Sequence, residues 1–140
     1  MEPLSDTSPQ GLVLRLAAVW NRLERTLDTQ LSAARGISFA EYRLLRALAD
    51  APGATASRVD LAGQVGLTPS GVTRALRPLE KLRVVRTVKS ERDARLALAT
   101  LTKAGRELVA DASAVIDDVM GTRLRRVARP TLSDLVEELL

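Results

Sequence analysis

Apolar residues recur every three or four positions over most of the chain, which is the spacing of amphipathic helices. This spacing predicts a long first helix from about Pro9 to Ala34 and a second helix from Phe39 to about Asp50. Ser38 and Glu41 form the sequence pattern of a capping box at the start of the second helix. Residues 1–8 lack the apolar spacing, and we expect them to be frayed. The pattern indicates a mainly α-helical chain.

Two shorter helices follow, with a tight turn between them. Ser57 can cap a helix that runs to about Val65, and Gly66 then takes the left-handed position at which helices commonly end. Thr68 can cap the next helix, and Pro69 stands at its first position, where no amide donor is needed. A separation of about three residues between two helices is that of a helix-turn-helix motif.

The helix after this turn divides into two faces at about 100° per residue. Its apolar face carries Val72, Ala75, Leu76, Leu79 and Leu82, and its polar face carries Ser70, Thr73, Arg74, Arg77 and Lys81. Small hydroxyls followed by Arg suit entry into a DNA major groove, where Arg binds guanine edges or phosphates. Each residue alone is explained as solvated surface, but their gathering on one face favours DNA contact. Pro78 removes a helical hydrogen bond, and we expect a kink there or a reset last turn.

Two short β-prone runs, Val84–Val88 and Arg95–Ala99, flank a charged tip at residues 89–94 and predict a hairpin. Arg92 and Arg95 can reach a minor groove, whose narrow A·T-rich sections attract Arg. A free carboxylate near phosphates would repel them. We therefore expect Asp93 to fix a neighbouring guanidinium through a charge-assisted bond.

A last long helix is predicted from Lys103 to about Val127, capped by Thr102. Pro130 is expected to break it, and Thr131 to cap a short amphipathic end over residues 132–140. The first and last helices both carry apolar stripes, so both are candidates for a dimer interface. The stripe of the first helix follows a near-heptad path suited to a helix of a second subunit, although its own domain could also cover it.

These elements predict a mainly α-helical fold with a small β-wing, a winged helix-turn-helix with terminal dimerisation helices. We expect one domain over residues 1–140, a DNA-binding lobe over residues 36–102, and dimerisation helices over residues 9–35 and 103–140.

The net charge of +4 is unevenly distributed. Residues 57–101 hold nine Arg or Lys and four Asp or Glu, a net +5, and the rest of the chain is close to neutral. A basic segment in neutral surroundings is typical of a phosphate-backbone binder, although a solvated Arg-rich surface would look the same in composition. The few aromatic residues lie outside this segment, which disfavours single-stranded nucleic acid binding by base stacking.

The composition also excludes several kinds of chemistry. The chain has no Cys and no His, so disulfides, thiolate or imidazole metal sites and His general-base catalysis are absent. No nucleophile–base pair or phosphate loop is visible, so we expect neither an enzyme nor a cofactor. No apolar run reaches the roughly 20 residues of a membrane span, and no signal-peptide pattern opens the chain. We therefore expect a cytoplasmic protein.

Several short motifs together resemble the MarR family of bacterial transcriptional regulators. The helix-turn-helix carries Val65-Gly66-Leu67-Thr68, Val72-Thr73-Arg74 and Leu79-Glu80-Lys81, the wing carries Asp93-Ala94-Arg95, and the next helix opens with Leu101-Thr102-Lys103-Ala104-Gly105. The resemblance covers about residues 10–140. Arg83 departs from the family, which usually has Gly there, so we expect the turn before the wing to be made differently or the strand to be shifted.

The resemblance implies a homodimer that binds a palindromic operator on double-stranded DNA, usually as a repressor. It implies DNA-contacting roles for Thr68, Pro69, Ser70, Thr73, Arg74, Arg77, Lys81, Arg92, Asp93 and Arg95, with Arg95 in the minor groove and held by Asp93. It also implies release by a small, often aromatic or phenolic, effector in a crevice between the dimer region and the DNA-binding lobe. Trp20, Arg43 and Arg46 are candidate lining residues, although Trp20 is expected mainly in the core. The alternative is a winged helix used for protein interaction without specific DNA binding.

Overall fold

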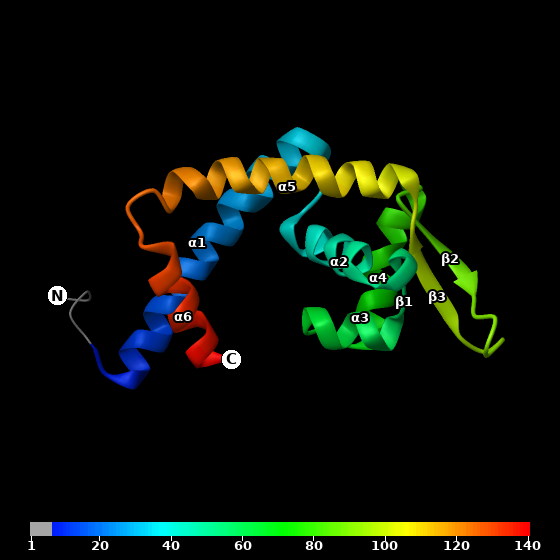
Figure 1. The fold of residues 1–140 in the computed structure, drawn as a ribbon, viewed down its shortest axis with the longest axis horizontal. Coiled ribbons are helices and arrows are strands. Elements are labelled where there is room, and N and C mark those ends of the chain that lie inside the picture. The colour runs from blue at the N-terminus through cyan, green and yellow to red at the C-terminus, as the bar shows by residue number, and fades with distance from the viewer. Residues whose placement is uncertain (1–6) are drawn as a thin grey trace.

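The computed structural model describes residues 7–140. They form a helical lobe with a β-wing, and a long helix, labelled α5, runs across the top of this lobe in the view of Figure 1. In chain order the elements are α1 (Pro9–Arg35), α2 (Phe39–Asp50), the 3₁₀ turn η1 (Pro52–Ala54), β1 (Thr55–Ser57), α3 (Arg58–Val65), α4 (Pro69–Lys81), β2 (Val85–Lys89), β3 (Ala97–Leu101), α5 (Lys103–Arg123) and α6 (Arg129–Leu139). None of these helices is long and apolar enough to cross a membrane. The predicted mainly α-helical winged fold is confirmed.

The helix starts follow the capping residues in the sequence. Ser38 and Glu41 form both hydrogen bonds of the capping box, and Gly36 ends α1 in the left-handed conformation with a φ of 68°. The start of α1 corrects our expectation of a frayed segment, because the Ser8 hydroxyl accepts a hydrogen bond from the Gly11 amide and caps the helix. Residues 1–6 lie outside the described part of the chain.

The end of the chain also differs from the prediction. α5 stops at Arg123 rather than near Val127, and Pro130 lies in the first turn of α6 instead of breaking a helix. Pro is compatible with this position because the first amides of a helix have no intrahelical acceptor. Ala128 is the N-cap and makes no side-chain cap bond, so the predicted capping role of Thr131 is wrong.

The wing is a three-stranded antiparallel sheet in the order β1-β3-β2. Sequence patterns did not predict β1, whose three residues are too short to show alternation; in the structure it pairs Thr55 with Thr100 and Ser57 with Leu98. β2 and β3 begin one and two residues later than predicted, and Val85 pairs with Leu101. The connecting tip is therefore longer, from Ser90 to Leu96.

One apolar core joins α2, α3, α4, the wing and the start of α5. Leu45, Leu48, Leu61 and Leu76 are fully buried in it, so the faces of the helix-turn-helix that point inward are fixed by packing. The two halves of α1 differ: Leu27 and Leu31 are buried, whereas Leu12, Leu16 and Val19 are each about half exposed. Only the second half of the α1 stripe is thus covered by its own chain.

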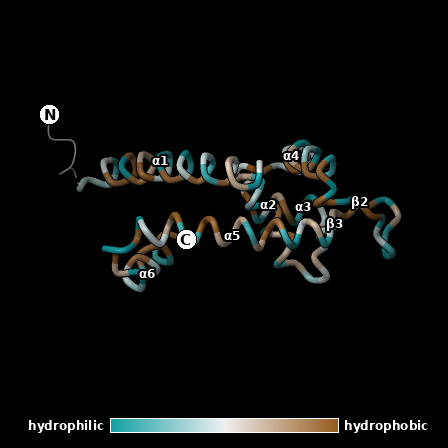
Figure 2. Tube along the Cα trace, turned by 90° about the horizontal axis from the view of Figure 1, so that it is seen from above, coloured by the Kyte–Doolittle hydropathy of each residue, from teal (hydrophilic) through white to brown (hydrophobic). Residues whose placement is uncertain are grey.

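α6 also projects from the core. It buries none of its residues, and it exposes Leu132, Leu135, Val136 and Leu139. α1 and α6 overlap in the view of Figure 1, but the view from above separates them (Figure 2). The apolar faces of α6 and of the first half of α1 are therefore not covered by each other within one chain.

The turn after α4 keeps the geometry that Gly would provide. Arg83 has a φ of 60°, its amide donates to the Glu80 carbonyl, and the Val84 amide donates to the Leu79 carbonyl. These two bonds form a Schellman motif, in which the left-handed residue is usually Gly. Of the two outcomes expected here, the second is found: Arg83 itself adopts the left-handed conformation, so the turn is not made differently, and β2 starts one residue later than predicted, at Val85.

Replacing Arg83 by Gly should raise the free energy of unfolding by about 0.5–1 kcal/mol, because Gly adopts a positive φ without the steric cost that an L side chain meets. The gain is smaller than that steric cost since Gly also has more freedom in the unfolded chain. Urea unfolding at one fixed protein concentration measures the change. Arg83→Ala is the matched control, because it removes the exposed side chain and keeps the strain. Equal stability of the Gly and Ala variants would show that the turn is unstrained.

The start of α5 is tied to the same turn. The Thr102 amide donates to the Val84 carbonyl at 3.0 Å, and the Thr102 hydroxyl donates to the Arg83 carbonyl at 2.8 Å while accepting from the Gly105 amide at 3.1 Å. Gly105 is buried where a Cβ atom would overlap the Val84 carbonyl oxygen and the Leu101 side chain. The Leu-Thr-x-x-Gly helix start is thus explained by close packing of the start of α5 on the turn that follows α4.

Candidate nucleic-acid interface

α3 and α4 are joined by the tight turn that the sequence predicted. Gly66 ends α3 with a φ of 70°, and the Leu67 amide donates to the Ala62 carbonyl at 3.1 Å. Thr68 caps α4 by accepting a hydrogen bond from the Gly71 amide at 3.0 Å, and Pro69 follows at the first helical position. Thr68 and Pro69, both named as site residues, therefore shape the start of α4 and are exposed to solvent.

α4 has one buried and one exposed face. Val72, Leu76 and Leu79 are fully buried, whereas Ser70, Arg74, Arg77 and Lys81 are exposed. Thr73 is half-buried, and its hydroxyl donates to the Pro69 carbonyl at 3.1 Å, so its methyl group and oxygen lone pairs are left for a ligand. The structure thus gathers a small hydroxyl and three cations on the outer surface of the second helix.

Pro78 lies on the exposed side of α4 without ending it. The Leu82 amide donates to the Pro78 carbonyl at 3.0 Å, the ordinary helical bond, so the last turn is not reset. Pro78 has no amide to offer the carbonyl of Arg74, and at an exposed position water can replace that donor.

The tip of the wing is held by hydrogen bonds from its own backbone amides to two of its side chains. Asp93 accepts a hydrogen bond from the Arg95 amide at 3.0 Å, and the Ser90 hydroxyl accepts from the amides of Arg92 and Asp93. In the part of the chain that the structure describes, Asp93 forms no ion pair with Arg92 or Arg95, which corrects the expected contact with a guanidinium. Asp side chains readily bond an amide two residues on, and this bond forms the turn that presents Arg95.

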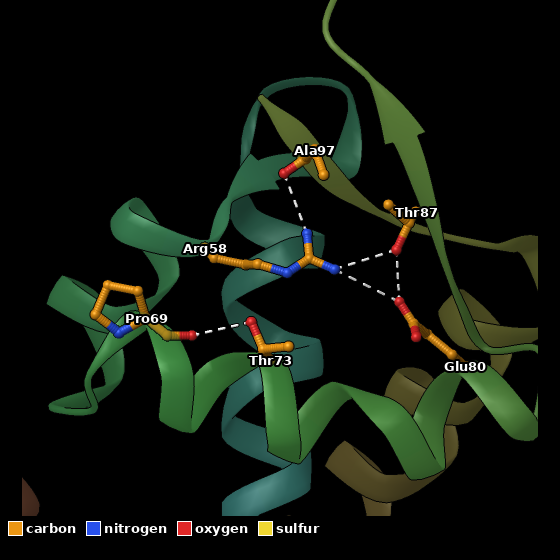
Figure 3. A network of polar contacts seen from close by, with 6 residues as sticks. All are labelled: Arg58, Pro69, Thr73, Glu80, Thr87 and Ala97. Atoms are coloured by element: carbon orange, nitrogen blue, oxygen red, sulfur yellow. Dashed lines mark hydrogen bonds and ion pairs between the residues drawn. The ribbon is translucent and has the colours of Figure 1, made fainter. Parts of the chain in front are cut away.

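A polar network that no sequence motif predicted connects the wing to α4 (Figure 3). Arg58, the first residue of α3, donates to the Ala97 carbonyl and to the Thr87 hydroxyl, both at 3.1 Å. Thr87 donates to Glu80 at 2.6 Å, and the Glu80 carboxylate lies 3.7 Å from the Arg58 guanidinium. Arg58 therefore contributes to wing alignment instead of facing a phosphate. No sequence pattern marks it, because its partners lie 22 to 39 residues away.

Aromatic residues meet where α1, α2 and α5 join. The rings of Trp20 and Phe39 are 5.6 Å apart, those of Phe39 and Tyr42 are 6.0 Å apart, and the Tyr42 hydroxyl hydrogen-bonds to Ser113 at 2.8 Å. Trp20 is 42% exposed, so its expected core position is wrong for this chain alone. Arg46 is paired with Asp50, and this hydrogen bond and charge raise the pKa of Arg46, which stays fully charged.

Comparisons with known proteins agree with this geometry. The sequence pattern of the MarR family matches residues 35–96. The HTH-type transcriptional repressor Rv2887 of Mycobacterium tuberculosis is 34% identical over 131 residues, which cover 91% of this chain and 88% of the relative.

Solved structures with the same fold include two regulators. Sco3205, a MarR family transcriptional regulator from Streptomyces coelicolor solved in complex with DNA, superposes with a TM-score of 0.82 at 24% identity, over 96% of this chain and 86% of that one. BldR from Sulfolobus solfataricus superposes with a TM-score of 0.81 at 23% identity, over 91% of each chain. The family match and the Mycobacterium relative, together with this fold, show that the chain belongs to the MarR family of transcriptional regulators and is not an enzyme.

Proposed function

We propose that this regulator represses transcription by occupying an operator in double-stranded DNA. The polar face of α4 enters the major groove, and the tip of the wing reaches the adjacent minor groove. The contacts are assigned to Thr68, Pro69, Ser70, Thr73, Arg74, Arg77, Lys81, Arg92 and Arg95, with Asp93 shaping the tip. The observation that carries the proposal is the set of exposed cations on α4, which form no ion pair within residues 7–140 and sit over a fully buried opposite face.

We further propose that two chains form a homodimer through α1, α5 and α6. The support is a set of apolar residues on α6 and on the first half of α1 that their own chain leaves exposed. These residues are grouped on two helices, whereas the apolar residues on the surface of a monomer are usually scattered singly. A two-fold dimer places two copies of α4 in successive major grooves about one turn of DNA apart, so the operator is palindromic.

We propose that a small aromatic or phenolic effector binds at the aromatic junction of Trp20, Phe39 and Tyr42 and thereby causes the regulator to release its DNA. An aromatic ligand can stack on these rings, and Tyr42 connects the junction to α5 through Ser113.

Since its target is promoter DNA, the regulator acts in the cytoplasm.

Selection of bound sequences from a random duplex pool tests the DNA-binding proposal. We expect an inverted repeat whose half-sites are centred about 10 base pairs apart. In anisotropy titrations of the selected duplex, affinity should fall by a factor of roughly 10³ or more between about 50 and 200 mM salt, as expected for several phosphate contacts. A scrambled duplex of equal length is the matched control and should bind more weakly than the selected duplex at both salt concentrations. No enrichment and no binding at low salt, with a protein partner recovered instead, would favour the protein-interaction alternative.

A further inference from the structure

One face of the wing sheet carries a row of polar side chains that is not among the proposed DNA contacts. The register pairs Arg86 with Thr100 and Thr100 with Thr55, so these three side chains form one row across the sheet. Side chains alternate along a strand, so this row lies on the face opposite Thr87. Thr87 faces α4, since its hydroxyl bonds to Glu80. The row therefore lies on the side of the wing turned away from α4.

At the base of the wing this row borders a hollow of about 540 Å³ that the first turn of α5 completes. Arg86 comes from β2, and Lys103 and Arg106 come from α5. The residues around the hollow include no Asp or Glu, and these three cations form no ion pair within residues 7–140. Two other hollows of similar size contain carboxylates, Asp50 and Asp60 in one and Asp28 and Glu41 in the other. A third, beside α1, also lacks Asp and Glu and is lined by Arg22, Arg25 and Arg123.

The hydroxyl groups at this hollow are already used. Thr55 hydrogen-bonds to the Gly53 carbonyl and to Thr100, and Thr102 donates to the Arg83 carbonyl. These hydroxyl groups are held in place and carry no charge. Binding of an anion at the hollow therefore depends on its two guanidinium groups and one ammonium group. Three cations gathered without a counter-charge repel one another, and a bound anion would remove that repulsion.

We propose that this hollow binds a phosphate-type oxyanion, bridging β2 and the start of α5. Each guanidinium can donate two parallel hydrogen bonds to a phosphate group, and the Lys103 ammonium adds a flexible point charge. An anion with at least two negative charges matches the three cations. Two sources share this chemistry, a free phosphorylated small molecule and a backbone phosphate of DNA running past the wing.

Isothermal titration with pyrophosphate at low salt, in the absence of DNA, tests the site. We expect saturable binding by the full-length protein and a loss on the order of tenfold or more in the Arg86→Gln/Arg106→Gln variant, because two charge-assisted contacts are removed. Arg125→Gln/Arg126→Gln is the matched control, since it removes the same charge from exposed arginines between α5 and α6. It should bind pyrophosphate like the unaltered protein. Circular dichroism melting checks that both variants are folded.

The absence of saturable heat at low salt would overturn the proposal, and so would an equal loss of affinity in both variants, which would indicate a general charge effect. A duplex of random sequence distinguishes the two sources. If the duplex displaces pyrophosphate and binds more weakly only to the Arg86→Gln/Arg106→Gln variant, the oxyanion is a DNA phosphate. If duplex and pyrophosphate bind together, it is a free anion. Pyrophosphate binding is measured without DNA, so failure of operator binding does not decide it.

Discussion

Replacing Gly105 by Ala should lower the free energy of unfolding by about 1–3 kcal/mol, the range expected for forced overpacking in a core. The new Cβ would overlap the Val84 carbonyl oxygen and the Leu101 side chain. Leu101 can shift, but the Val84 carbonyl is held by the Thr102 amide. Relief therefore requires α5 to move away from the turn that follows α4 and lose this bond. Urea unfolding at fixed protein concentration measures the loss.

Gly121→Ala is the matched control, because it makes the same change on the same helix at a position where an added Cβ meets nothing within 4 Å. It should leave stability unchanged or raise it by up to about 1 kcal/mol, since Ala favours a helix over Gly. If both variants were equally stable, α5 would not be as closely packed against the Arg83 turn as the structure indicates.

Removing Arg74 and Arg95 together should weaken operator binding at least about thirtyfold, because each contact contributes about 1–3 kcal/mol and the two positions are independent. Arg74 projects from α4 and Arg95 from the wing tip, and neither side chain forms a hydrogen bond or ion pair within the described residues. Their removal should therefore leave the fold and the oligomeric state unchanged. Anisotropy titration measures the affinity, and sedimentation measures the oligomeric state.

The single variants separate two kinds of contact. Arg74→Ala should relax base preference if this side chain reads a base, or weaken binding to all sequences evenly if it holds a phosphate. Arg15→Ala is the matched control, since it removes an exposed guanidinium from the polar side of α1, outside the proposed DNA-contacting set. Unchanged operator affinity in the double variant would remove both arginines from the proposed interface.

Local signals in the sequence predicted much of the fold. Ser38, Gly66 and Thr68 act on backbone groups within four residues, so the limits of α2, α3 and α4 followed from their identity. Most of the apolar face of α4 was also predicted correctly, because helical periodicity over 13 residues repeats often enough to be recognised. Leu82 was wrongly included, since it is the C-cap residue and 56% exposed.

The features that were missed depend on residues distant in sequence. β1 has three residues and exists because β3 pairs with it, and Arg58 acts through Thr87, Glu80 and Ala97. Contacts of this kind, between residues far apart in the chain, produce no periodic pattern in the sequence. Asp93 shows a different limit, since its identity allowed either a guanidinium or a nearby amide as its partner, and the shorter-range bond formed.

The position of Trp20 gives this protein a built-in optical signal. It is the only Trp in the chain, it is partly exposed, and its ring lies against Phe39 at the junction of α1 and α2. Indole emission depends on contact with water, so covering this ring by a second chain or by an aromatic molecule would shift the emission to shorter wavelength. Association and effector binding can therefore be followed in the unlabelled protein, by dilution in one case and by titration in the other.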